Sequence, residues 1–275
     1  YLEGEMQAMD MPRQILEGSP YPLRAVFALG LNARMFPDSN RMFRALDSLD
    51  FFVDTDLFLT DTAKWADIVL PACSSFERGE FKPYPGGLAW YTSPVIELVG
   101  EARSDVQIIA QLAEVMDLPD ETLKKGYEYF IQHYILDDFG VTVEQLKKVD
   151  LPVKIADVTE QKDLELLKKG LNTPTGRFEL KSAVIEQHPE WGLDPLPTYV
   201  DPLNDADPQE YPFVFTSGSR IPGAIHSRLH KVPRNRSLRP DPMADMNSGD
   251  CCRLGVSEGD DIVISTPKGS ITVKV

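Results

Sequence analysis

The side chains best suited to bind an anion lie together in the last third of the sequence. Residues 211–240 contain six Arg or Lys side chains, two histidines and no acidic residue, and these are Arg220, Arg228, Lys231, Arg234, Arg236, Arg239, His226 and His230. The rest of the chain carries 22 basic and 43 acidic side chains, a net charge of −21. A local charge of +6 in that background predicts an anionic partner, although a solvated basic loop would have the same composition.

Small residues directly precede the first of these arginines. Residues 213–216 form a short apolar run that predicts a strand, and Thr216, Ser217, Gly218 and Ser219 then lead to Arg220. Small side chains let backbone N–H groups approach phosphate or carbonyl oxygens, and arginine adds a planar fork of donors. The pattern favours a phosphate-bearing or ring-shaped ligand.

A second group of candidates follows two predicted strands near the N-terminus. Residues 24–29 are an apolar run that ends at Gly30, which is typical of a buried parallel strand followed by a tight turn. A helix predicted from 37–40, with Met42 and Leu46 on its apolar face, leads to a strand at 51–53. This strand–helix–strand spacing predicts a crossover unit, which places the loop 30–33 at the carboxyl end of the first strand. Ligands of open α/β sheets bind at that end.

Two carboxylates are predicted to follow the second of these strands. A carboxylate at the position of Asp54 or Asp56 can accept hydrogen bonds from a ribose or a purine, or it can cap the helix expected around 61–63. These two interpretations remain open for either residue.

Other chemistries have little support. Ser75, Ser217 and Ser227 lack the Gly-x-Ser-x-Gly elbow of a nucleophile, and there is no phosphate-loop lysine motif or Gly-x-Gly-x-x-Gly. His226 and His230 are four residues apart, but the prolines and glycine around them disfavour the helix that a metal pair would need. Three cysteines are too few and too badly spaced for a disulfide framework or a zinc site. We therefore predict no metal ligand in this chain.

The remaining elements predict two dissimilar parts. A strand is expected at 67–71, a hairpin or ordered excursion at 77–91, a helix at 105–116 with one apolar face, and a helical, charged stretch from 121 to 170. A proline-rich linker follows, and beyond it strands at 261–265 and 270–273 with a short helix at 247–255 indicate a β-barrel or sandwich. The expected organisation is an α/β part at 1–190 with an excursion at about 77–100, a linker at 191–211, and a β domain at 212–275.

Composition narrows the functional class. The 275 residues have a net charge of −15, which argues against nucleic acid or an anionic membrane as the general partner. No apolar run approaches the roughly 18 residues of a membrane span. The chain begins without Met and stops within a strand pattern, so we expect a fragment of a longer polypeptide whose localisation is unknown.

Taken together, these segments resemble the molybdopterin oxidoreductase (DMSO reductase) family. The matching segments, in chain order, are 30–32, 53–63, 66–72 with Glu77, 100–105, 175–180, 194–199, 216–220, 226–227, 247–250 and 254–261. The resemblance implies a Rossmann-like parallel-sheet part followed by a double-psi β-barrel-like domain, incomplete at its C-terminus, that binds the molybdopterin dinucleotide. It also implies the residues that bind this cofactor, which are Gly30, Asn32, Asp56, Thr60, Thr62, Thr216, Gly218, Ser219, Arg220, His226, Ser227, Asn247 and Asp250.

Within this set, Asp56 aligns best as the guanine or ribose contact, and helix capping explains Asn247 and Asp250 equally simply. The excursion resembles a hairpin that in relatives returns toward an iron–sulfur cluster, but here it has the sequence Gly79-Glu80-Phe81-Lys82 instead of a Gly-rich basic one.

The resemblance implies a C-terminal part of an enzyme that carries Mo or W on bis(molybdopterin guanine dinucleotide). Such an enzyme transfers two electrons, or an oxygen or sulfur atom, to or from a small substrate. The ligand to the metal and a [4Fe–4S] cluster would belong to the missing N-terminal part, so the fragment alone should be inactive. Expected partners are the rest of the polypeptide and an iron–sulfur electron-transfer subunit, and neither nucleic acid nor a membrane span is expected.

Two alternatives stay open. Segments 175–180 and 194–197 lean toward the branch that includes thiosulfate, polysulfide and tetrathionate reductases together with the non-redox acetylene hydratase and transhydroxylase. A tungsten hydratase or hydroxyl-transfer enzyme is therefore one alternative. A subunit that keeps the architecture without the cofactor is the other, and the concentration of six cations at 211–240 argues against it.

Overall fold

The computed structural model describes residues 6–156, 168–200, 206–218, 229 and 232–275. Contacts between Cα atoms divide the chain into two units. The first unit comprises residues 1–23, 32–48 and 200–275, and the second comprises 24–31 and 49–199. In the part of the chain that is described, no helix is both long and apolar enough to cross a membrane.

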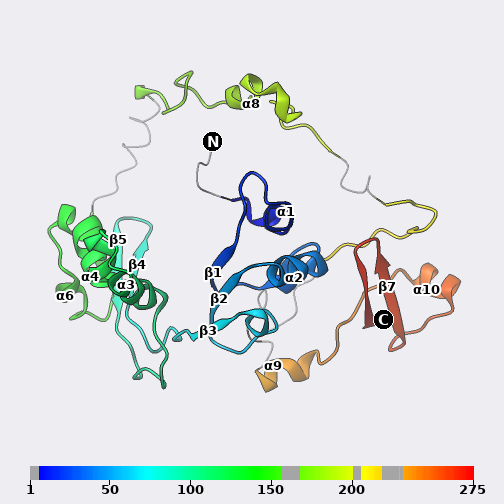
Figure 1. The fold of residues 1–275 in the computed structure, drawn as a ribbon, viewed down its shortest axis with the longest axis horizontal. Coiled ribbons are helices and arrows are strands. Elements are labelled where there is room, and N and C mark those ends of the chain that lie inside the picture. The colour runs from blue at the N-terminus through cyan, green and yellow to red at the C-terminus, as the bar shows by residue number, and fades with distance from the viewer. Residues whose placement is uncertain (1–5, 157–167, 201–205, 219–228, 230–231) are drawn as a thin grey trace. The chain divides into compact units, whose positions relative to one another are not determined.

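A three-stranded parallel sheet lies in the second unit. Its strands are β1 (Ala25–Leu29), β2 (Phe51–Asp56) and β3 (Ile68–Pro71), in the order β1-β2-β3 (Figure 1). Both pairs are parallel, and Asp54 lies opposite Ala28 on one side and Val69 on the other. The predicted crossover unit and third strand are therefore confirmed.

Two details of this sheet differ from the prediction. β2 continues to Asp56, so Asp54 and Asp56 lie within the strand and not after it. β1 is not a buried strand: Phe27 and Leu29 are 40% and 45% exposed, because little of the described chain covers the face they share.

The helix predicted between the first two strands begins where its sequence indicates. α2 (Ser39–Asp47) starts after Asp38, whose carboxylate accepts a hydrogen bond from the Arg41 N–H at 2.9 Å. Met42 and Leu46 are buried, as the spacing predicts. α2 belongs to the first unit, as do the helices η1 (Ala8–Asp10), α1 (Met11–Glu17) and η2 (Ala33–Met35).

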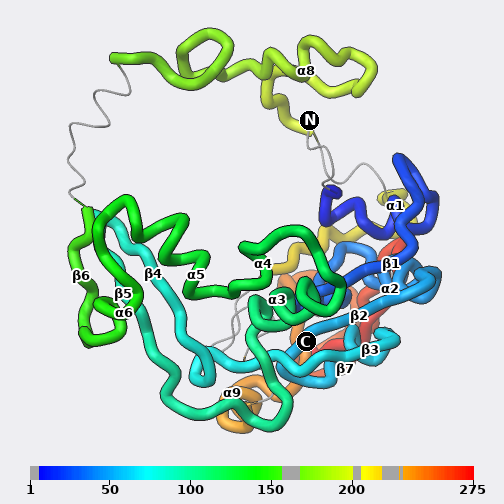
Figure 2. The backbone as a smooth tube through the Cα atoms, turned by 60° about the vertical axis from the view of Figure 1, so that its left-hand side comes forward, coloured from blue at the N-terminus to red at the C-terminus, as the bar shows by residue number. Residues whose placement is uncertain are grey.

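A second, smaller core forms around an antiparallel sheet in the second unit. β4 (Glu80–Tyr84) and β5 (Leu88–Thr92) form the predicted hairpin, and β6 (Val153–Lys154) pairs with β5 (Figure 2). Short helices accompany them: α4 (Glu121–Lys125), α5 (Tyr127–Ile131), η4 (Gln132–Leu136), η5 (Asp137–Phe139) and α6 (Val143–Leu146). The buried side chains are Phe81, Ala89, Tyr91, Ile131, Leu136, Val143 and Leu146.

The prediction of helix from 121 to 170 is therefore wrong around residues 153–154. Helical segments lie between Glu121 and Leu146 and again at residues 168–169, but residues 153–154 join a sheet because they add a third strand to the hairpin. Residues 157–167 lie outside the described residues.

Short helices occupy other parts of the second unit. η3 (Ala63–Trp65) precedes β3, while α8 (Ala183–Gln187) and η6 (Pro189–Trp191) follow the small core. α3 (Asp105–Val115) starts at Ser104 with a capping box to Gln107. The spacing predicts an apolar face of Val106, Ile109, Leu112, Ala113 and Met116. Of these Ala113 is buried and Ile109 half-buried, whereas Val106, Leu112 and Met116 are exposed and the neighbouring Ile108 is buried instead.

The described residues of the C-terminal part of the first unit form two helices and one hairpin. They are α9 (Pro233–Leu238), α10 (Ser248–Leu254), β7 (Asp261–Thr266) and β8 (Gly269–Lys274). The predicted strands at 261–265 and 270–273 and the helix between Asn247 and Gly255 are confirmed. The strand predicted at 213–216 is wrong: these residues are exposed and no described strand pairs with them, so their apolar run has no hydrogen-bonded neighbour.

Candidate functional site

A tight turn follows β1 at the carboxyl end of the parallel sheet. Gly30 has a φ of 67°, and its N–H donates to the carbonyl of Thr55 on β2 at 2.8 Å. Apart from Gly30 and its two chain neighbours, no atom of the described residues lies within 4 Å of the place where a Cβ would stand, so the turn is open on that side. Asn32, two residues on, uses its side-chain oxygen to accept the Arg34 N–H at 3.1 Å and so begins η2. The structure thus gives Asn32 a local capping role besides the cofactor contact that the resemblance implies.

Asp54 is the most unusual residue at this edge of the sheet. Its side chain is fully buried, and neither carboxyl oxygen has a hydrogen bond of ordinary geometry within the described residues. Burial, and secondarily the negative charge of Asp56, raise the pKa of Asp54 to about 6, although the nearby backbone N–H groups of Leu31 and Thr55 lower it somewhat. A buried carboxyl without a counter-charge costs free energy when it ionises.

The sequence treated Asp54 and Asp56 as equivalent, and the structure separates them. Asp56 is partly exposed at the end of β2, and one of its carboxyl oxygens accepts the Phe58 N–H at 3.3 Å. Neither residue caps the short helix η3: its first N–H, that of Ala63, donates to Thr60 Oγ1 at 3.1 Å. The alternation of β2 places both carboxylates on the same face as the buried Phe52, so the sequence carries no signal that singles out Asp54.

The connection from β2 to β3 carries the other predicted contacts of this edge. Thr62 is 2% exposed, and Thr60 holds η3 as described. Between β2 and these threonines, Leu57, Phe58 and Leu59 are 53%, 60% and 61% exposed. An apolar rim therefore lies directly beside a turn and a carboxylate, which is a combination that suits a ligand with both a planar ring and a polar group.

The basic segment is described only in part. Ser219, Arg220, His226 and Ser227 lie outside the described residues, as does His230. Thr216 and Gly218 are exposed, and Gly218 has a φ of 126°. Within the described chain, Arg234, Arg236 and Arg239 form no ion pair with an acidic side chain. These three cations of the segment therefore have no acidic side chain to neutralise them among those residues.

Asn247 and Asp250 have local partners. Asn247 accepts the Gly249 N–H at 2.8 Å and caps α10, while Asp250 pairs with Arg253 at 2.9 Å. Helix capping and a surface ion pair thus account for these two side chains, and their contact with a cofactor remains a prediction.

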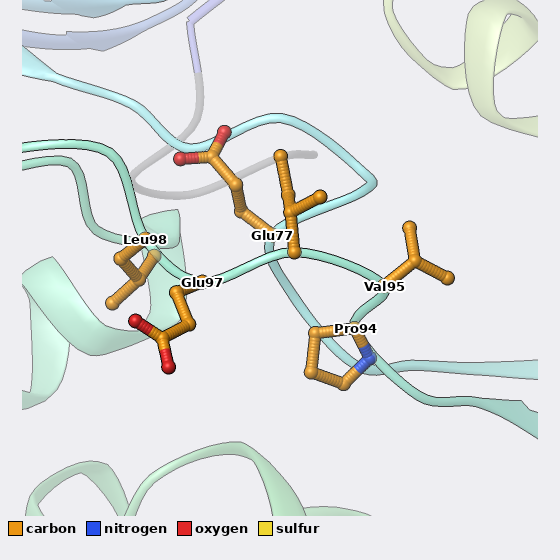
Figure 3. A pocket seen from close by; sticks show the side chains of 6 residues that line it. Glu77, Pro94, Val95, Glu97 and Leu98 are labelled. Carbon is orange, nitrogen blue, oxygen red and sulfur yellow. The ribbon is translucent and has the colours of Figure 1, made fainter.

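No metal site is evident in the described part of the chain, where no group of three or more His, Cys, Asp or Glu side chains is arranged around a common point. An open surface hollow of about 560 Å³ is lined by Glu77 and residues 94–98. The carboxylates of Glu77 and Glu97 point in different directions there (Figure 3). Glu77 instead accepts hydrogen bonds from the Ser74 N–H, the Ser74 hydroxyl and the Val99 N–H at 2.6–2.8 Å, and the Ser74 bonds hold its pKa below the usual value. The hollow therefore offers no pair of acids for catalysis.

Comparison with known proteins assigns the class. A family model described as molybdopterin oxidoreductase matches residues 7–115, and one described as molydopterin dinucleotide binding domain matches residues 213–275. Together they cover more than half of the chain, which belongs to the molybdopterin oxidoreductase family. The second domain implies a molybdopterin cofactor that carries molybdenum or tungsten.

Several proteins match this chain across both of the regions that the family models cover. The chain is 32% identical over 264 residues to a Bacillus subtilis protein named probable oxidoreductase YoaE, covering 94% of this chain and 37% of that one. It is 31% identical over 260 residues to acetylene hydratase of Syntrophotalea acetylenica, covering 92% and 34%. The solved structure of acetylene hydratase from Pelobacter acetylenicus superposes with a TM-score of 0.81 at 29% identity, covering 96% of this chain and 36% of that one. The chain thus has the fold of the corresponding third of that enzyme, and spans about a third of the length of these relatives.

Proposed function

We propose that this chain is the C-terminal portion of an enzyme that carries Mo or W on bis(molybdopterin guanine dinucleotide), and that it binds and orients this cofactor. The observation that carries the proposal is the order of the two family matches, at 7–115 and 213–275, within one chain that superposes over 96% of its length on acetylene hydratase. The metal, when bound, would supply two-electron or oxygen or sulfur atom transfer on a small substrate.

The residues of the parallel sheet fit the nucleotide end of such a cofactor. Gly30 leaves the turn open, as a diphosphate would need, and the exposed Asp56 supplies an acceptor for ribose hydroxyls or guanine N–H groups. Thr60, Thr62 and Asn32 would lie near that end. The Rossmann-like character of this part rests on the same crossover topology.

The basic segment fits the phosphate and pterin groups. Thr216, Gly218, Ser219, Arg220, His226 and Ser227 would contact them, with Asn247 and Asp250 nearby. The arginines of α9 that have no acidic partner among the described residues support this assignment, because uncompensated cations favour an anion. We assign this domain to 212–275, as a double-psi β-barrel, with a linker at 191–211 and the α/β part at 1–190.

A test of the cofactor uses the full-length protein. Its metal content and the guanine nucleotide released on denaturation should be in a ratio of about two nucleotides per metal. Replacement of Asp56 with Asn should lower the nucleotide content, whereas replacement of the exposed Asp61 with Asn, a matched loss of one charge in the connection that follows β2, should not. Absence of nucleotide from the wild-type protein would instead support a structural subunit without cofactor.

A second candidate function, a non-redox hydratase or hydroxyl-transfer enzyme that uses tungsten, is favoured by the likeness to acetylene hydratase in both sequence and structure. The two can be separated with the loaded full-length enzyme. Hydration of acetylene without an electron donor would establish the hydratase, whereas turnover that needs a reduced viologen dye would establish the oxidoreductase. In the second case we expect a [4Fe–4S] cluster in the rest of the polypeptide and an iron–sulfur partner subunit.

A further inference from the structure

Asp54 lies beneath the turn that is proposed to bind a diphosphate, yet it cannot touch a ligand there. Its side chain is 0% exposed, whereas Asp56, two residues on, is partly exposed. The parallel register sets Asp54 opposite Ala28, two residues before Gly30, and the Gly30 N–H is bonded to the residue that follows Asp54. Any effect of Asp54 on a ligand must therefore pass through the turn or through its own charge.

Among the described residues, no cation near Asp54 favours its ionised form. Its neighbours across the sheet are Ala28 and Val69, which are apolar, and the charged group of the described chain that acts on its pKa is Asp56 on its own strand. Burial and this like charge raise the pKa of Asp54 to about 6. An added negative charge nearby can therefore change the protonation state of this residue close to neutral pH.

We propose that binding of a diphosphate at the turn 30–32 is coupled to the uptake of one proton by Asp54, a residue that positions the turn instead of contacting the ligand. The inference rests on the proposed function, because it assumes an anion at this turn. A diphosphate brings negative charge close to the buried carboxyl and so favours its neutral form. One proton moves from solvent to a carboxyl oxygen of Asp54, and no other bond changes.

Protonation has a second consequence for the turn. The backbone N–H of Leu31 is close enough to Asp54 to stabilise its carboxylate. A neutral carboxyl attracts an N–H group less than a carboxylate does, so protonation leaves this N–H more available to a phosphate oxygen. Both effects act in the same direction, and the affinity of the turn for a diphosphate should fall as the pH rises through 6.

The proposal can be tested with cofactor-free full-length protein and GDP-mannose, whose diphosphate carries two esters and has no group that titrates between pH 5 and 8. If the diphosphate raises the pKa of Asp54 by about one unit, as expected for charges a few ångströms apart at moderate effective dielectric, the dissociation constant rises about tenfold between pH 5 and 8. Calorimetry in two buffers of different ionisation enthalpy should then detect uptake of about half a proton per probe at pH 6.5.

Two variants separate the outcomes. Asp54→Asn should bind the probe with an affinity that is constant over this range and without proton uptake, while Asp61→Asn should behave like the wild type. An equal pH dependence and proton uptake in Asp54→Asn would overturn the role of Asp54 and leave the proposed function standing. Absence of binding to the wild type at every pH would contradict both the nucleotide site and the inference that rests on it.

Discussion

Gly79 allows Tyr91 to close the small core of the second unit, and a methyl group at this position should open it. A Cβ on residue 79 would stand 2.7 Å from Tyr91 Cζ and closer still to the hydroxyl, although ordinary contacts begin near 3.4 Å. Gly79 is not in the left-handed region, so the obstacle is steric alone. The Tyr91 ring is 5% exposed among close-packed side chains and has little room to retreat.

The expected cost follows from two contributions. Forcing a ring out of a packed core costs roughly 1–3 kcal/mol. The same movement strains the hydrogen bond from the Tyr91 hydroxyl to Glu128, 2.9 Å long, and a bond to a charged group contributes about 1.5–3 kcal/mol when it is intact. Because the ring can keep part of that bond, we expect Gly79→Ala to lower the opening free energy of this core by about 3 kcal/mol.

Hydrogen exchange measured by mass spectrometry can give the opening free energy of this core separately from the rest of the chain, from peptides that cover residues 80–92 and 127–146. A double-mutant cycle with Tyr91→Leu supplies the control, because leucine has no ring for the methyl group to meet. In that background Gly79→Ala should cost less than about 1 kcal/mol, which gives a coupling of about 2–3 kcal/mol. Equal effects of Gly79→Ala in both backgrounds would refute the steric explanation.

Three further predictions concern other parts of the fold. Folding raises the pKa of Asp54 from 3.8 to about 6 through burial, so the folded chain keeps a proton that the unfolded chain releases between these values, and stability falls as the pH rises through that window. Asp54→Asn should remove this fall. Between pH 4 and pH 7.5 the free energy of unfolding of the wild type should therefore drop by up to about 3 kcal/mol relative to that of Asp54→Asn, measured by urea unfolding at both pH values. An equal pH dependence of the two proteins would contradict this. Leu146 is 1% exposed, so Leu146→Ala should reduce the hydrogen-exchange protection of peptides from 127–146 by about 2–5 kcal/mol. If the exposed control Leu151→Ala loses more protection than Leu146→Ala, Leu146 does not belong to this core. Asp38→Ala should cost about 1 kcal/mol by removing the bond to the Arg41 N–H, seen as faster exchange in the first turn of α2, while Asp38→Asn should keep most of the protection.

Local sequence patterns predicted the elements whose partners are near in the chain. The apolar run at 24–29, the cap at Asp38 and the spacing of Met42 and Leu46 determine a strand–helix–strand unit through interactions within about 30 residues. The hairpin β7–β8 and the capped helix α10 are equally local. Each of these elements was predicted within one to three residues because the forces that form it act between close neighbours.

The wrong predictions concern segments whose structure depends on a partner that is distant in the sequence. Residues 213–216 have a strong strand composition but no described neighbour with which to pair, and composition alone does not make a strand. Residues 153–154 show the opposite case. Their charged surroundings predicted a helix, but they pair as a strand with the edge of a hairpin that lies more than 60 residues earlier in the chain. The apolar face of α3 was misplaced for a related reason, since its period shows that one face is apolar but not which side is covered.

The candidate site shows the same limit at the scale of two residues. Asp54 and Asp56 have identical side chains and point to the same face of β2, so neither type nor periodicity distinguishes them. Their positions along the strand do: Asp54 is flanked by Ala28 and Val69 within the sheet, while Asp56 reaches its end, where the turn after Asp56 provides the Phe58 N–H. The apolar surroundings of Asp54 favour a protonated carboxyl group, whereas the exposed position of Asp56 allows contact with a ligand. If both are used, Asp56 contacts the nucleotide, and the protonation of Asp54 determines how its affinity depends on pH.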